Sequence, residues 1–248
     1  MRSRKGSDPR LSQARSLAGL LLGTLLLAAC GSAPPSESMP TRVADLEPLA
    51  GRKVVLMKPD IELFVIHSGG IPELNAGWTT SARKDVAAFL DRRLSAKKMV
   101  VISAEQADAA REDDPLAVQL VRLQSAVAQS ILASHFKRFD RLPTKEERFE
   151  WSLGSEARVL AQRYQADYAL FVAFREHYPS EDATGPHGGS LSRRFAVLSL
   201  YRKGYAMLVE LESGRVVWFA ERDRISPGLR TSGEVRATLD TLLENFPG

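Results

Sequence analysis

The sequence predicts a mixed α/β fold, with a sheet of about five to seven strands and helices packed on it. Three observations lead to this prediction. Apolar segments rich in β-branched residues alternate with amphipathic helical patterns over residues 53–174. Three strand-like segments then follow one another over residues 195–220, with turns at Gly204 and at Ser213-Gly214 between them. A capped amphipathic pattern closes the chain and predicts a C-terminal helix.

The first 29 residues have the parts of a bacterial secretory signal. Residues 2–16 are basic and polar, and residues 17–29 form an apolar run. This run is too short to cross a bilayer as a helix, which needs about 20 residues. We therefore expect a cleaved signal peptide over residues 1–29.

Cys30 follows this run directly and is the only cysteine in the chain. The sequence Leu-Ala-Ala-Cys at 27–30 resembles the lipobox of bacterial lipoproteins. The resemblance implies that Cys30 is lipidated and begins the mature chain. Gly31 stands where the aspartate typical of inner-membrane retention would be, which implies an outer-membrane lipoprotein, anchored by lipid and facing the periplasm. The alternative is a signal peptide in which Cys30 is incidental.

Charge and cysteine content exclude several function classes. Residues 1–29 hold five of the 34 basic residues and one of the 30 acidic residues, so the remaining chain has 29 of each. The basic pI of about 9.3 thus reflects the signal, and no nucleic-acid partner is expected. Lipidation of Cys30 leaves no thiol for a disulfide, a thiolate metal site or a cysteine nucleophile.

Residues 30–50 are expected to form the lipid anchor and a flexible tether, because they are rich in proline and serine and lack apolar periodicity. Residues 51–248 have an even composition with no second low-complexity break. They predict a single α/β domain.

The first half of this domain predicts a βαβ unit. Residues 53–57 and 62–66 are short apolar strands separated by a proline break. Residues 80–97 carry apolar side chains at helical spacing with charges on the other side. A further strand is expected over residues 99–103.

Three helices and a central strand are expected next. Asp114 before a proline is a favourable N-cap for a long helix over about residues 115–137. A capping box at Thr144 and Glu147 predicts a second helix, which would carry Phe149, Trp151 and Leu153. Another helix is expected over 155–165. The nearly continuous apolar run 167–174 then predicts a central strand.

The last third predicts antiparallel strands and a final helix. Strands are expected over residues 195–201, 205–211 and 216–220. A second capping box opens the final helix, whose apolar side chains share one face. The box and that face are formed by Thr231 and Glu234, and by Val235, Leu239, Leu242, Leu243 and Phe246.

Motifs of catalysis are nearly absent from the sequence. It contains no nucleophile elbow, no H-E-x-x-H and neither nucleotide fingerprint, so no cofactor is expected. The S-x-x-K strings at 95–98 and 134–137 coincide with expected helix ends, and the acidic residues at 146, 147 and 150 fit an exposed helix. The His187-Gly-Gly-Ser string lies in an expected loop, where glycine and serine are common.

One cluster keeps a hydrolase hypothesis open. His177, His187 and Glu181 could converge in an active site acting on peptidoglycan or lipid. The same residues with Asp182 could bind a metal, although a solvated loop explains the same composition. The three tryptophans at 78, 151 and 218 could line a groove, although core positions are the commoner use of such residues.

The order of elements resembles a small α/β domain shared by envelope proteins. An Ala-Arg-Lys-Asp-Val helix segment, a buried Ala-Asp-Tyr-Ala-Leu-Phe-Val strand and a closing hairpin from Gly204 to Trp218 carry the resemblance. This domain occurs in the curli-secretion lipoprotein CsgG, in the penicillin-binding-protein activator LpoB and at the N-terminus of TolB. The resemblance implies a periplasmic interaction domain without an active site.

These observations predict a non-catalytic lipoprotein that binds an envelope protein or assembles with itself. The Cys30 anchor is its one predicted site, and neither a catalytic residue nor a metal ligand is assigned. The hairpin bearing Trp218 and the exposed sheet edges are the expected docking surface, because strand edges offer unpaired backbone groups. The alternatives are the envelope hydrolase and a carrier of apolar cargo.

Overall fold

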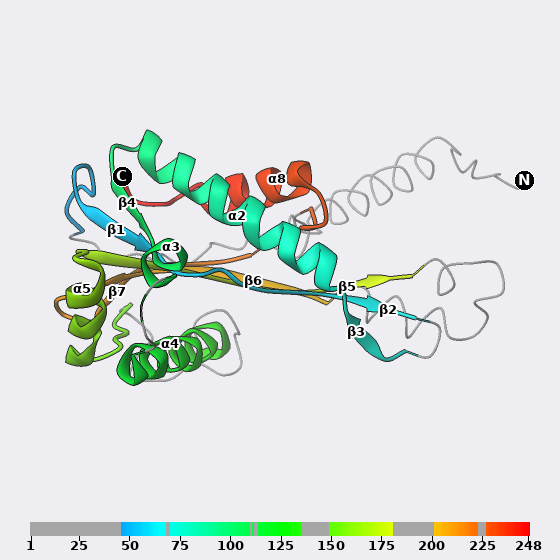
Figure 1. The fold of residues 1–248 in the computed structure, drawn as a ribbon, viewed down its shortest axis with the longest axis horizontal. Coiled ribbons are helices and arrows are strands. Elements are labelled where there is room, and N and C mark those ends of the chain that lie inside the picture. The colour runs from blue at the N-terminus through cyan, green and yellow to red at the C-terminus, as the bar shows by residue number, and fades with distance from the viewer. Residues whose placement is uncertain are drawn as a thin grey trace, which may run out of the picture. The chain divides into compact units, whose positions relative to one another are not determined.

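The sheet is built along one long central strand, β5 (Tyr168–Pro179). A computed structural model of the chain describes residues 46–67, 70–109, 111, 114–134, 149–180, 201–222 and 227–248. Within them, seven strands form one mixed sheet with helices on both faces (Figure 1). The predicted fold class is therefore confirmed.

Two short strands follow one another along the same edge of β5. β1 (Lys53–Leu56) and β2 (Asp60–Ile66) both run parallel to β5, and the break between them is where the proline predicted it. Beyond them, β4 (Val100–Ser103) pairs with β1 in parallel, and β3 (Pro72–Leu74) pairs with β2 in the antiparallel sense. β3 was not predicted, because three residues that include a proline show no strand pattern.

The other edge of β5 carries the predicted antiparallel hairpin. β6 (Arg202–Glu210) pairs with β5, and β7 (Val216–Glu221) pairs with β6. The turn between them places Gly214 at φ 71°, a left-handed conformation that glycine adopts without strain. Of the strand expected over 195–201, residues 195–200 lie outside the described residues.

Two helices cover one face of the sheet, α2 (Ala76–Ala96) and α8 (Ser232–Leu242) (Figure 1). α2 links the parallel strands β1 and β4, which confirms the βαβ prediction. It begins four residues earlier than expected, because the Asn75 side chain accepts a hydrogen bond from the Trp78 N–H and caps it. The capping box of α8 forms as predicted, and its apolar face is buried.

The opposite face carries α3 (Ala104–Asp108), α4 (Pro115–Ser134) and α5 (Arg158–Tyr164) (Figure 1). α4 begins at Pro115 as predicted, and the expected end at 137 falls outside the described residues. A short 3-10 turn, Ser155–Ala157, leads into α5. The core on this face packs side chains of the helices, among them Leu120, Ile131 and Leu160, on the sheet.

The prediction of a helix that carries Phe149, Trp151 and Leu153 is wrong for the described residues 149–154. Ser152 forms an isolated antiparallel bridge with Arg215. The Leu153 N–H donates to the Gly214 carbonyl at 2.8 Å, and the Val216 N–H donates to the Trp151 carbonyl at 2.8 Å. These bonds satisfy the backbone at the β6–β7 turn, a long-range pairing that the local helical pattern could not reveal.

Candidate functional site

Few of the predicted site residues fall within the described part of the chain. Cys30, Glu181, Asp182 and His187 lie outside it, so the lipid attachment and the hydrolase cluster remain predictions. His177 lies in β5 instead of the expected loop, and its ring stacks on Tyr201 with centroids 4.6 Å apart. Across the described ranges, no group of three or more potential metal ligands comes together.

The three tryptophans do not form a groove. Trp218 is 1% exposed and meets the Phe246 ring edge-on at 4.9 Å, so it belongs to the core under α8. Trp78 is half-buried on α2 and Trp151 is half-buried on the opposite face of the sheet. The Trp218 side chain therefore cannot contact a partner, because it points into the protein, and docking at the exposed sheet edges stays a prediction.

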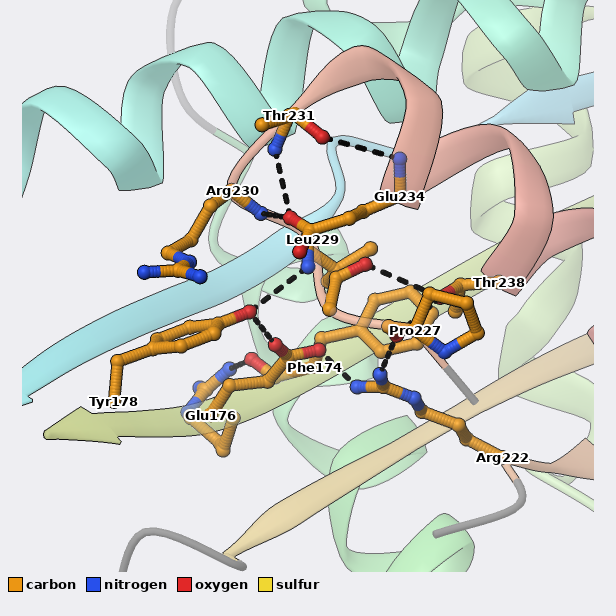
Figure 2. A network of polar contacts seen from close by, with 12 residues as sticks. Phe174, Glu176, Tyr178, Arg222, Pro227, Leu229, Arg230, Thr231, Glu234 and Thr238 are labelled. Atoms are coloured by element: carbon orange, nitrogen blue, oxygen red, sulfur yellow. Dashed lines mark hydrogen bonds and ion pairs between the residues drawn. The ribbon is translucent and has the colours of Figure 1, made fainter. Parts of the chain in front are cut away.

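A buried polar network joins β5 to the segment before α8 (Figure 2). The carboxylate of Glu176, fully buried on β5, accepts hydrogen bonds from the Arg222 guanidinium and from the Tyr178 hydroxyl. The Leu229 N–H donates to the same hydroxyl at 2.9 Å. Arg222 also donates to the Pro227 carbonyl. Burial and the neighbouring Glu176 carboxylate raise the pKa of Tyr178.

This network holds α8 against the sheet. Thr238 of α8 donates to the Gly228 carbonyl at 3.2 Å, and the Arg230 guanidinium lies 4.6 Å from the centre of the Tyr178 ring. Both carboxylate oxygens of Glu176 are engaged inside the protein, which is the condition for a buried charge to be tolerated. Sequence reasoning missed the network, because the predicted strand ended at residue 174, two residues before Glu176.

The outer side of α4 differs from an ordinary solvent-facing helix. Among its 20 residues, α4 has one charged residue, Arg122. The side chains of Leu116, Val118, Val121 and Leu123 are 54%, 39%, 41% and 43% exposed. They are half of the eight exposed large apolar residues in the described ranges. We call these four residues the α4 surface.

The core accounts for only part of the apolar character of α4. By length and hydropathy, α4 is the one described helix that could cross a membrane. Its inner residues pack on the sheet, and the Gln124 side chain donates to the Tyr205 hydroxyl at 3.1 Å. This packing explains Leu120 and Ile131, but it does not involve the α4 surface.

Two hollows lie along one flank of α4. The first hollow has a volume of about 470 Å³, and the second hollow about 120 Å³. Residues of α4, of α3 and of the α5 end line the first, together with Met57 and Lys58, which follow β1. Residues of α4, β5 and the start of β6 line the second.

The first hollow lies where the sheet topology favours binding. β1 continues in the same sheet as β2 and β3 and the chain then reaches β4 through α2 on one face, whereas β4 continues to β5 through α3, α4 and α5 on the other. In open α/β sheets, ligands bind beyond the carboxyl ends of the parallel strands. Met57 and Ala104, the residues that follow β1 and β4, both line this hollow.

One wall of the first hollow is held by a set of polar contacts. The Asp108 carboxylate accepts hydrogen bonds from Arg163 at 2.8 Å and from the Tyr164 hydroxyl at 2.6 Å. Burial and the Asp108 hydrogen bond raise the pKa of Tyr164 to about 12. The Tyr164 hydroxyl therefore keeps its proton near neutral pH and joins α5 to α3.

No protein-family model matches the chain, and no curated protein matches it. One similar solved structure is a lipoprotein of Neisseria meningitidis, with 13% identity and a TM-score of 0.35 over 78% of this chain and 95% of that one. Another is the C-terminal domain of LpoB from Salmonella enterica, with 12% identity and a TM-score of 0.29 over 72% and 84%. The solved structures similar to this chain thus include a lipoprotein and the LpoB domain that the sequence resembles, and the likeness is distant.

Proposed function

We propose that the protein is a non-catalytic lipoprotein of the bacterial envelope, anchored in the outer membrane through Cys30, whose α/β domain binds another protein through the α4 surface. The lipobox supports the anchor. More than one acyl chain, as lipoproteins of this type carry, holds a protein stably on a membrane where one chain does not. A tether of about 20 residues would let the domain reach a partner in the periplasm.

The exposed apolar side chains of α4 carry the proposal. α2 has nearly the same length as α4 and carries six charged residues, all of which are exposed or partly exposed. α4 has one, and its exposed positions include two leucines and two valines. These four side chains lie within eight residues of one helix, and exposed apolar areas on soluble proteins mark interaction sites.

A protein partner fits the α4 surface better than a lipid bilayer does. Helices that lie in the membrane interface combine many lysines and arginines with tryptophan, phenylalanine or leucine. α4 has one arginine and no aromatic residue, and its other polar positions are glutamine and serine. Its flank also borders two hollows, which suit side chains of a protein.

The test is a crosslinked co-purification of the full chain from detergent-solubilised membranes. We expect one envelope protein at near-stoichiometric yield with the wild type, and at least a tenfold lower yield with Leu123→Asp. Arg92→Asp, at an exposed position of α2, is the matched control and should retain the partner. Equal yields from Leu123→Asp and wild type, with both variants folded by circular dichroism, would contradict the proposal.

The anchor has its own test. The Cys30→Ala variant should be lost from the membrane fraction. If this variant stays membrane-bound, another segment holds the protein on the membrane.

A further inference from the structure

We infer that the flank of α4 with the two hollows receives an acidic segment of the partner, with one large apolar side chain seated in the first hollow. We call this flank, with the residues that line both hollows, the α4 groove. The inference rests on the proposed function and adds where the partner binds and which chemistry it presents.

The two hollows form one line along the helix. Val118, Val121 and Arg122 border the first hollow, and Ser125, Gln129 and Leu132 border the second. Residues spaced three or four apart share one side of a helix, so all six lie on the same flank. From Val118 to Leu132 the helix rises about 21 Å at 1.5 Å per residue, which is long enough for a segment of about six extended residues.

The opposite wall of the α4 groove is also continuous along the chain. Lys58, two residues after the end of β1, lines the first hollow, and Asp60, the first residue of β2, lines the second. The short segment between β1 and β2 therefore borders both hollows. A single bound segment can contact both.

The first hollow suits an apolar side chain. Its volume of about 470 Å³ lies within the range of about 300–1,000 Å³ that binding pockets occupy. Met57, Ala104, Ala117 and Tyr164 are buried residues among those that line it, and Val121 is exposed at it. Anchor residues of protein partners typically fill pockets, and these apolar residues form the part of the hollow that such a side chain would contact.

The charges that remain unpaired along the α4 groove are mostly positive. Lys58, Arg122 and Lys203 have no ion pair among the described residues. Lys203 lies over the Tyr201 ring at 5.1 Å. These three cations favour an acidic segment, since complementary charge sets specificity and speeds association.

Most carboxylates of the groove are already engaged within the domain. Asp108 binds Arg163 and the Tyr164 hydroxyl, and Asp60 binds Arg175 with both oxygens. Asp114 accepts the Leu116 N–H at 2.9 Å and caps α4. Glu105 and Asp114 have no ion pair among the described residues, so the cations without an ion pair outnumber such carboxylates by three to two along the groove.

Site-specific photocrosslinking of the full lipidated chain in cells tests the inference. A benzophenone amino acid at Val121 reports on the first hollow, and the same group at Leu123 reports on the other flank of α4. We expect the Val121 adduct to map, by mass spectrometry, to a partner peptide that has net negative charge and a large apolar residue. The pair of changes Lys58→Glu and Arg122→Glu should lower the yield of this adduct at least tenfold. Lys58→Arg with Arg122→Lys should retain it, and so should the matched reversal Lys84→Glu with Arg92→Glu on α2.

The outcomes separate the inference from the proposed function. Adducts from Leu123 alone would show that a partner binds α4 but would overturn the inference that it binds in the α4 groove. A Val121 adduct with a basic or uncharged segment, with a second copy of this chain or with phospholipid would also overturn it, and so would a yield unchanged by the reversal in the groove. Absence of any adduct from both positions, in variants shown to be folded by circular dichroism, would contradict both proposals.

Discussion

α2 and α4 lie on opposite faces of one sheet and have nearly equal lengths, of 21 and 20 residues, yet their outer sides differ. α2 carries six charged residues around its buried stripe, whereas α4 carries one. The inner sides are alike, because both bury a row of residues at helical spacing. The inner side of each helix thus serves folding, and the outer side of α4 is the part left for binding.

The two layers also differ in how they are fastened. The α2 and α8 layer contains the buried Glu176–Arg222 pair, which joins β5 to the segment before α8. The α4 layer has its ion pair, Asp108–Arg163, at the rim of a hollow, where Asp108 is about one-third exposed. Buried pairs cost far more to break than exposed ones.

The largest effect is expected from Arg222→Met, which leaves the Glu176 carboxylate buried without its cation. The free energy of unfolding should fall by about 3–5 kcal/mol. Urea unfolding at neutral pH measures it. Adding Glu176→Gln should recover most of the loss, because the buried charge is then gone. A loss below about 1 kcal/mol would mean that this network does not hold the α8 layer.

A matched pair of leucines separates the inner side of one helix from the outer side of the other. Leu90→Ala, fully buried on α2, should cost about 2–5 kcal/mol. Leu123→Ala, 43% exposed on α4, should change the unfolding free energy by about 0.5 kcal/mol or less. The same urea series compares them. Equal losses would erase the distinction between the two sides.

A smaller effect is expected at the α8 cap. Thr231→Ala removes the side chain that accepts the Glu234 N–H at 3.2 Å and should cost about 1 kcal/mol. Thr231→Ser keeps the hydroxyl and should cost less, which thermal unfolding can resolve. Partner capture should be the same in both variants. A loss of partner capture in Thr231→Ala would indicate that the partner binds on the α8 side of the sheet. It would contradict the assignment of binding to α4.

The last prediction is a pH dependence at the first hollow, which has no effect on stability near neutral pH. The pKa of Tyr164 is raised from 10.0 to about 12 in the fold, so its stabilising contribution is complete below about pH 10 and is lost as the pH rises toward 12. Tyr164→Phe should therefore give a shallower fall in unfolding free energy across this range. The pKa values of Tyr168, Tyr178 and Tyr205 are also raised, so some slope should remain. Parallel curves for variant and wild type would contradict the assignment.

Patterns within a short stretch of sequence predicted most elements correctly. The capping box of α8, the start of α4 at Pro115 and the apolar run of β5 depend on neighbours within about four residues. The errors arose where distant residues decide the outcome. Residues 149–154 pair with the β6–β7 turn instead of forming a helix, and β3 exists because it pairs with β2.

The sequence by itself determined the fold class, most of the elements and the expectation of a lipid anchor, because periodicity, capping residues and the lipobox are local signals. Only the tertiary structure decided that Trp218 is core, that Glu176 meets Arg222 46 residues away, and that the flank of α4 borders two hollows. The physical reason is that exposure and pairing depend on which elements pack together. A leucine at position 90 and one at position 123 look alike in the sequence, and the sheet covers only the first.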